Sequence, residues 1–199
     1  MFQADKEKAQ PSGANYLQVP YKGPVSFKSF EKKKVGNTEK CFVAEAKLLG
    51  EDIQGNDCSG ITKEYVEWNP EGKGDKKTKN AVNRLAYFAS HLAPPEEVFD
   101  IKAESWEEYV DKTIMLLNQH SAKDRDDIEM KFVGSVYQGN PKITTPGYHS
   151  FIANQDSENS LEWSQSEQQD NREYLEVKNS SPTNPEEADK IEDLGDQSF

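Results

Sequence analysis

The chain has 199 residues, of which 34% are hydrophobic and 30% charged, and its net charge at pH 7 is −12. This length accommodates one ordinary domain with tails, but so polar a composition indicates that part of the chain stays outside any core. No run approaches the roughly 18 apolar residues of a membrane span. The first eight residues lack the apolar stretch of a signal peptide, so we expect a cytoplasmic protein.

The N-terminal part of the chain predicts a flexible arm followed by three strands. Residues 1–19 are polar and form the expected arm, with one possible short strand at its end. Apolar and polar residues then alternate in three segments, which indicates strands that are buried on one face. The predicted strands are Val25–Glu31, Lys40–Leu49 and Ile61–Trp68, and Gly36-Asn37 supplies the turn of a hairpin loop over Lys32–Thr38.

Two helices and further strands are predicted next. Apolar residues recur at helical spacing in two segments, and Pro94-Pro95 ends the first of them. Ser105 is the expected N-cap of the second helix, with Glu108 at the capping-box position. The predicted helices are Lys77–Ala93 and Ser105–Gln119, and the predicted strands are Asp127–Tyr137, a return strand beginning at Lys142 after the Gln138-Gly139-Asn140 turn, and Tyr148–Ala153.

The C-terminal segment carries most of the charge. Residues 155–199 contain 13 acidic and 3 basic residues, which leaves 23 acidic and 21 basic residues in residues 1–154. Apolar periodicity stops after Asn154, so we expect a disordered acidic tail, with at most a transient turn near Tyr174. Its last residue is an aromatic carboxylate. Asp193, Asp196 and Phe199 are therefore candidate contacts to a basic, apolar pocket on a partner protein.

The order of elements predicts the fold of residues 20–154. Three meandering strands, a helical insert and a closing hairpin follow one another as in a five-stranded OB barrel. We therefore expect a mainly β OB-fold with a helical insert and a disordered acidic C-terminal tail. A generic α+β sandwich has the same order of elements and remains an alternative.

The strands carry candidate contacts to single-stranded nucleic acid. Such binding needs cations that follow the phosphates and aromatic rings on which bases stack. The candidate residues are Lys28, Phe30, Lys32, Lys33, Lys34, Lys40, Lys63, Tyr65, Trp68, Lys131 and Tyr137. A lysine run at a hairpin is also typical of a solvated turn that protects a sheet edge.

Several aromatic residues have a structural interpretation instead. Phe27, Phe42 and Phe132 alternate with polar residues and are expected in the barrel interior. Tyr65 and Trp68 are three positions apart on one predicted strand, so their side chains point to opposite faces and at most one of them faces outward. Tyr65 is the better candidate for stacking.

Enzymatic and metal-binding signals are weak. The sequence lacks a phosphate-binding Gly-x-x-x-x-Gly-Lys-Ser/Thr loop, a Gly-x-Ser-x-Gly elbow and a His-Glu-x-x-His pair. Cys41 and Cys58 have no Cys-x-x-Cys spacing and are expected to be free thiols. The three histidines are scattered, and the acidic residues of 124–127 are explained equally well by a loop. We therefore expect no enzyme, no cofactor and no bound metal.

Body and tail together resemble the phage-encoded single-stranded DNA-binding proteins. The likeness lies in Phe27–Leu49, in Tyr65–Asn69 followed by Asn83-Arg84-Leu85, in Lys131–Gly134 to Pro146-Gly147-Tyr148, and in the acidic tail ending at Phe199. It covers about two thirds of the chain in pattern, and the Leu194–Ser198 tip is less acidic than that of bacterial relatives. The resemblance implies sequence-independent binding of single-stranded DNA in replication, recombination or repair, in the host cytoplasm, by a possible homodimer.

Two other functions fit the same sequence. One is a protein-interaction or inhibitor module whose acidic surface occupies a basic partner; the other is a recombination annealing protein. For a DNA-binding protein, the acidic tail is expected to recruit replication proteins and to compete with DNA for the lysines. Deleting residues 155–199 would then raise the affinity for DNA at low salt.

Overall fold

Six strands, four α-helices and a short 3-10 helix make up the part of the chain that the computed structural model describes, namely residues 19–35, 38–58, 62–66, 75–146, 151–155 and 161–180. The strands are β1 (Tyr21–Val35), β2 (Thr38–Leu48), β3 (Thr62–Val66), β4 (Ile128–Tyr137), β5 (Asn140–Thr144) and β6 (Ile152–Asn154). The helices are α1 (Asp75–Ala89), α2 (Pro95–Phe99), α3 (Trp106–Gln119), η1 (Ala122–Asp124) and α4 (Gln165–Ser180).

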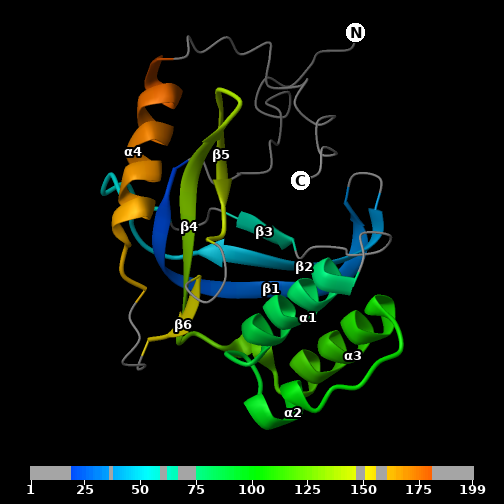
Figure 1. Ribbon diagram of the computed structural model, residues 1–199. Helices are drawn as coiled ribbons and strands as arrows, with labels where there is room; N and C mark the ends of the chain where they lie inside the picture. The colour runs from blue at the N-terminus through cyan, green and yellow to red at the C-terminus, as the bar shows by residue number, and fades with distance from the viewer. Residues whose placement is uncertain are drawn as a thin grey trace, which may run out of the picture.

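The strands form one antiparallel sheet in the order β3-β2-β1-β4-β5, and β6 also pairs with β4. Strand β4 pairs with different neighbouring strands in its two halves. Its first half pairs with β1, from Tyr21 opposite Phe132 to Val25 opposite Ile128, and its second half pairs with β5. The β4–β5 hairpin therefore extends beyond the main sheet as an arm (Figure 1).

The order of elements along the chain, with a helical insert between the third and fourth strands, agrees with the sequence prediction, but the sheet is open. Strands β3 and β5 lie at opposite ends of the strand order, and the described residues record no pairing between them. Strand β5 pairs with the second half of β4, which extends beyond the part of β4 that pairs with β1. The described architecture is thus a mixed α/β arrangement of an antiparallel sheet and helices.

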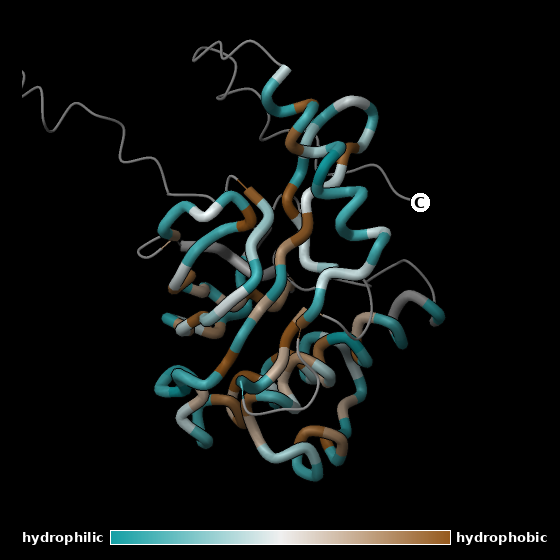
Figure 2. Tube along the Cα trace, turned by 90° about the vertical axis from the view of Figure 1, so that its left-hand side faces the viewer, coloured by the Kyte–Doolittle hydropathy of each residue, from teal (hydrophilic) through white to brown (hydrophobic). Residues whose placement is uncertain are grey.

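Helices α1 and α3 cover one face of the sheet and enclose the core (Figures 1 and 2). The ring of Phe88 on α1 lies among three strand phenylalanines, with centroid distances of 5.6 Å to Phe27, 5.7 Å to Phe42 and 6.4 Å to Phe30. The predicted burial of Phe27, Phe42 and Phe132 is confirmed, since each is at most 4% exposed. Edge-on aromatic contacts of this kind add to the free energy gained by burial alone.

A β-bulge changes the facing of residues along β1. The β1–β2 register shifts between Phe27 and Ser29, so that Lys28 is the extra residue. After this shift Phe30 lies opposite Ala44, and both residues are buried. Strict alternation predicts Phe30 on the sheet face opposite to Phe27. This part of the prediction is wrong, because the extra residue of the bulge returns Phe30 to the same buried face as Phe27.

The helical insert follows local sequence signals. Ser105 caps α3, since its side chain accepts a hydrogen bond from the backbone N–H of Glu108, and the carboxylate of Glu108 accepts one from the backbone N–H of Glu104. Pro94-Pro95 separates α1 from the short helix α2, in which Pro95 takes the first-turn position that proline tolerates. Helices α1 and α3 agree with the sequence prediction, whereas the short helix α2 is an addition to it.

Helix α4 lies inside the segment that we predicted to be a disordered tail. Its N-terminus carries a reciprocal capping box: Ser164 Oγ accepts from the backbone N–H of Glu167, and the Glu167 carboxylate accepts from the backbone N–H of Ser164. Asn171 and Tyr174 are buried, although the helix is otherwise polar. For residues 161–180 the expectation of disorder is therefore wrong; residues 156–160 and 181–199 lie outside the described residues, as do residues 1–18.

Candidate nucleic-acid interface

The lysines of β1 contact acidic side chains instead of forming an open basic ridge. Lys28 Nζ lies 3.0 Å from Glu45 Oε1 on β2. Lys32 Nζ lies 2.7 Å from Asp111 and 3.2 Å from Glu107, both on α3. The hydrogen bond to Asp111 raises the pKa of Lys32 above its ordinary value. Any phosphate that approaches Lys32 would have to compete with these carboxylates.

The lysine run lies within a strand and not in the predicted loop. Strand β1 continues to Val35, which pairs with Thr38, so the connection between β1 and β2 is short. Lys33 is half-buried. Lys34 and Lys40 belong to β1 and β2, and their side chains lie outside the described set.

Phe30 does not fit the predicted role of a stacking platform. It is 5% exposed, and its ring packs against Phe27, Phe42 and Phe88. A ring enclosed in the core cannot offer a face to a nucleotide base. The bulge beside it is the reason, since it turns Phe30 toward the helices.

The third-strand candidates are placed only at the level of the backbone. Lys63 and Tyr65 lie in β3 opposite Ala46 and Ala44 of β2. Their side chains, and the whole of Trp68, lie outside the described residues.

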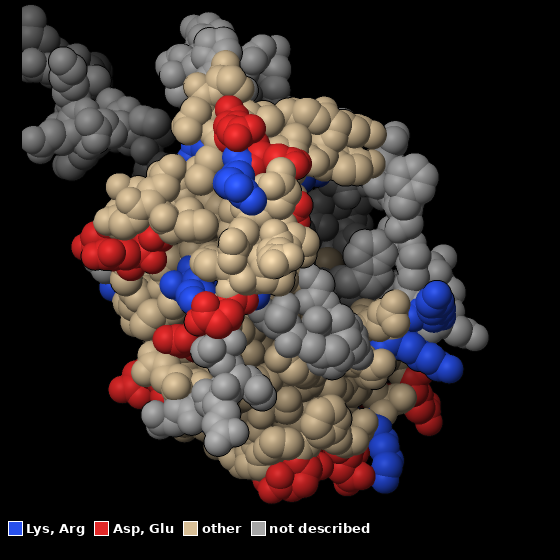
Figure 3. All heavy atoms as spheres, turned by 60° about the vertical axis from the view of Figure 1, so that its left-hand side comes forward, with Lys and Arg blue, Asp and Glu red and all other residues tan. Residues whose placement is uncertain are grey.

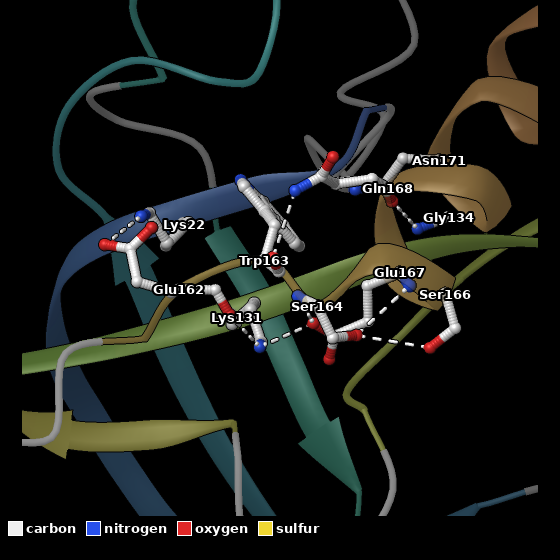
Figure 4. A network of polar contacts seen from close by, with 10 residues as sticks. All are labelled: Lys22, Lys131, Gly134, Glu162, Trp163, Ser164, Ser166, Glu167, Gln168 and Asn171. Carbon is white, nitrogen blue, oxygen red and sulfur yellow. Dashed lines mark hydrogen bonds and ion pairs between the residues drawn. The ribbon is translucent and has the colours of Figure 1, made fainter.

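Lys131 is buried beneath α4 and is not open to phosphate in this conformation. It is 1% exposed; its Nζ lies 2.8 Å from Glu167 Oε2 and donates to the carbonyl of Glu162 at 3.0 Å. The ammonium also lies 5.6 Å from the ring centroid of Trp163 (Figure 4). Alternation along β4 correctly separated Lys131 from Met130, but it did not reveal that α4 covers Lys131.

The electrostatics of Glu167 reflect this contact. Burial favours the neutral acid, but the hydrogen bonds from Lys131 and Ser164 outweigh it and lower the pKa of Glu167 below its ordinary value. Glu167 is therefore ionised at neutral pH and partners the buried ammonium. One carboxylate thus caps the helix and neutralises a strand lysine.

Among the predicted aromatic contacts whose side chains the structure describes, Tyr137 is exposed and Phe30 is buried. Tyr137 ends β4 at the tip of the arm and is 42% exposed. Lys142 on β5 places its ammonium 5.1 Å from the Tyr137 ring centroid. Between them the Gln138-Gly139 turn adopts positive φ at both residues, as expected for a tight hairpin.

Further residues at these contacts are not among the sequence-based candidates, namely Lys22, Lys142, Glu162, Trp163 and Glu167. Lys22 on β1 lies directly opposite Lys131 on β4, and its Nζ is 3.4 Å from Glu162 Oε1 (Figure 4). The Ser164-x-x-Glu167 pattern is a capping-box signal and could have revealed α4. The pairing of Lys22 with Lys131 had no local signal, because it depends on the register between distant strands.

Acidic side chains gather at the helical end of the molecule, at the bottom of Figure 3. The exposed acids of α2, α3 and the loop between them are Glu96, Glu97, Asp100, Glu104 and Asp111. Phe99 and Met115, on α2 and α3, are 66% and 56% exposed. This surface suits contact with basic groups and not with phosphates.

Neither a metal site nor a membrane helix emerges from the described ranges. Arg125 and Asp127 pair directly, which gives the acidic loop a structural role. Nowhere in those ranges do three or more histidine, cysteine or acidic side chains form a group that could hold a metal ion. The described helices also lack the combined length and apolar character needed to cross a bilayer. Cys41 and Cys58 are free thiols and are buried.

Comparisons with known proteins give no match: no protein-family model, curated protein or solved structure resembles the chain significantly. The predicted partner contacts of the tail, Asp193, Asp196 and Phe199, lie outside the described residues.

Proposed function

We propose that this protein binds single-stranded DNA without sequence specificity, in replication, recombination or repair, and that its acidic C-terminal segment recruits replication proteins. The observation that carries the proposal is the Tyr137–Lys142 pair on the projecting arm. An exposed aromatic ring beside a cation supplies the two contacts that a single strand needs, a stacking face and a phosphate partner.

The arm is a suitable place for such contacts. Both strands of the hairpin hold Tyr137 and Lys142 in register, since Tyr137 pairs with Asn140 and Ser135 with Lys142. The ring and the ammonium are therefore positioned before a ligand arrives. This preorganisation reduces the entropy lost on binding.

A fluorescence titration with oligo-dT tests the proposal. We expect binding that weakens steeply with salt, because counterions are released from the phosphates. Tyr137→Ala should cost about 1–3 kcal/mol of binding free energy, the contribution of one stacked base. Phe99→Ala is the matched control, since Phe99 is an exposed aromatic residue in acidic surroundings. Equal affinities of the two variants would count against the arm, and no binding at low salt would refute the function.

A protein-interaction module is the second candidate, and the acidic helical end favours it. Exposed Phe99 lies close in sequence to Glu96, Glu97 and Asp100, all of them exposed. An apolar anchor surrounded by acids complements a basic protein surface. This function predicts no oligo-dT binding and a salt-sensitive complex with a basic partner that Phe99→Ala weakens.

A further inference from the structure

Two lysines lie directly opposite each other on neighbouring strands of the sheet. Lys22 on β1 pairs with Lys131 on β4, so their side chains emerge on the same face. Like charges in this position repel, and the pair destabilises the sheet unless an anion lies between or beside them. The arrangement therefore creates a local requirement for negative charge.

The chain supplies that charge from the segment leading into α4 and from the first turn of this helix. Glu162 contacts Lys22 at 3.4 Å, and Glu167 contacts Lys131 at 2.8 Å. Between these acids Trp163 places its ring 5.6 Å from the Lys131 ammonium. Figure 4 shows the acids and the indole gathered around the two lysines. The segment thus presents an acid, a flat aromatic ring and a second acid to two cations.

We infer that Lys22 and Lys131 form a concealed phosphate-binding site for a single nucleic-acid strand, and that residues 162–167 occupy it as an internal substitute for that strand. The two carboxylates take the place of phosphates, and the Trp163 indole takes the place of a base. The inference rests on the proposed function and adds a second contact surface to the arm, one that opens when α4 leaves the sheet.

The packing of α4 is consistent with release. Only Asn171 and Tyr174 are buried among its residues, and most of its surface is polar. Asn171 Oδ1 accepts the backbone N–H of Gly134, but its buried Nδ2 has no hydrogen-bond partner among the described residues. A buried ion pair such as Lys131–Glu167 is weak evidence for stability, because desolvation offsets its attraction. Elements with few buried apolar contacts are those that open locally.

Hydrogen exchange of the full chain, with and without oligo-dT, tests the inference. Saturating oligo-dT at low salt should accelerate exchange of the α4 amides, while the α3 amides stay protected. The double variant Glu162→Gln/Glu167→Gln should show faster α4 exchange without DNA and about tenfold tighter oligo-dT binding, a typical coupling between competing ligands. Protected α3 amides show that the variant is folded.

The matched control is Asp170→Asn/Glu173→Gln, which removes two exposed acids from the same helix. It should change the affinity less than twofold and leave α4 exchange unaltered. DNA binding with unchanged α4 exchange, or equal affinities of the two double variants, would overturn the inference and leave the proposed function intact. Absence of oligo-dT binding by every variant would overturn the function and this inference with it.

Discussion

A Cβ atom built on Gly134 would lie 2.5 Å from Cγ and 2.6 Å from Cβ of Tyr174. These atoms are close to the α4 backbone and cannot move away without shifting the helix. The backbone N–H of Gly134 also donates a hydrogen bond of 2.8 Å to Asn171 Oδ1. Gly134 lies two residues beyond Phe132, the last β4 residue that pairs with β1. Helix α4 therefore covers β4 where β1 has ended, and glycine is required at the contact.

Gly134→Ala should displace α4 and lower the free energy of unfolding by about 1–3 kcal/mol, the usual range for overpacking. Urea unfolding measures this change. In a double-mutant cycle, Tyr174→Ala should relieve part of the cost of Gly134→Ala, because it removes the colliding ring. Additive losses would show that the two residues do not collide.

Phe30→Ala should cost about 3–5 kcal/mol of unfolding free energy, because it opens a cavity in the aromatic core. Tyr137→Ala should change stability by less than about 1 kcal/mol, as for an exposed residue. The two variants separate a core phenylalanine from a surface tyrosine. A stable Phe30→Ala protein with weakened DNA binding would restore the stacking role that its burial excludes.

The Lys131–Glu167 contact predicts a pH dependence. Because the pKa of Glu167 is lower in the folded protein, its contribution is fully present above the unfolded glutamate pKa, about 4.3, and is lost as pH falls through the folded value. The difference in unfolding free energy between the wild type and Glu167→Gln should thus be constant above about pH 5.5 and shrink as the solution is acidified. Unfolding at several pH values measures it, and a difference independent of pH would contradict the pairing.

Two truncations should behave differently. Removing residues 181–199 leaves α4 in place, so the free energy of unfolding should stay unchanged. Any gain in DNA affinity on this truncation would then come from losing the electrostatic competition by the acidic C-terminal residues. Removing residues 155–199 also uncovers Lys131 and Gly134, and should lower the unfolding free energy. Equal stability of the two truncated proteins would show that α4 adds nothing to the fold. Deleting Phe199 alone tests partner recruitment, since it leaves the charged side chains unchanged.

Local patterns predicted much of the fold. Hydrophobic periodicity predicts α1, α3 and β4. The N-cap of α3 follows from Ser105 together with Glu108, three positions later. The capping box of α4 is a signal of the same kind, but the polar composition of residues 155–180 favours a prediction of disorder. Short-range signals succeed here because helix caps and alternation involve residues a few positions apart.

The candidate contacts were harder to predict. Residue order alone is enough to locate the basic and aromatic side chains, to predict that most of the strands exist, and to place the negative charge toward the C-terminus. The folded chain alone shows that Phe30 is buried, that Lys32 and Lys131 contact acids, and that the sheet stays open. Residue order does not reveal these features, because exposure and charge pairing depend on strand register and on which distant segment covers a strand. In this protein a single bulge at Lys28 changes the exposure of Phe30, and the polar helix α4 changes the charge pairing of Lys131.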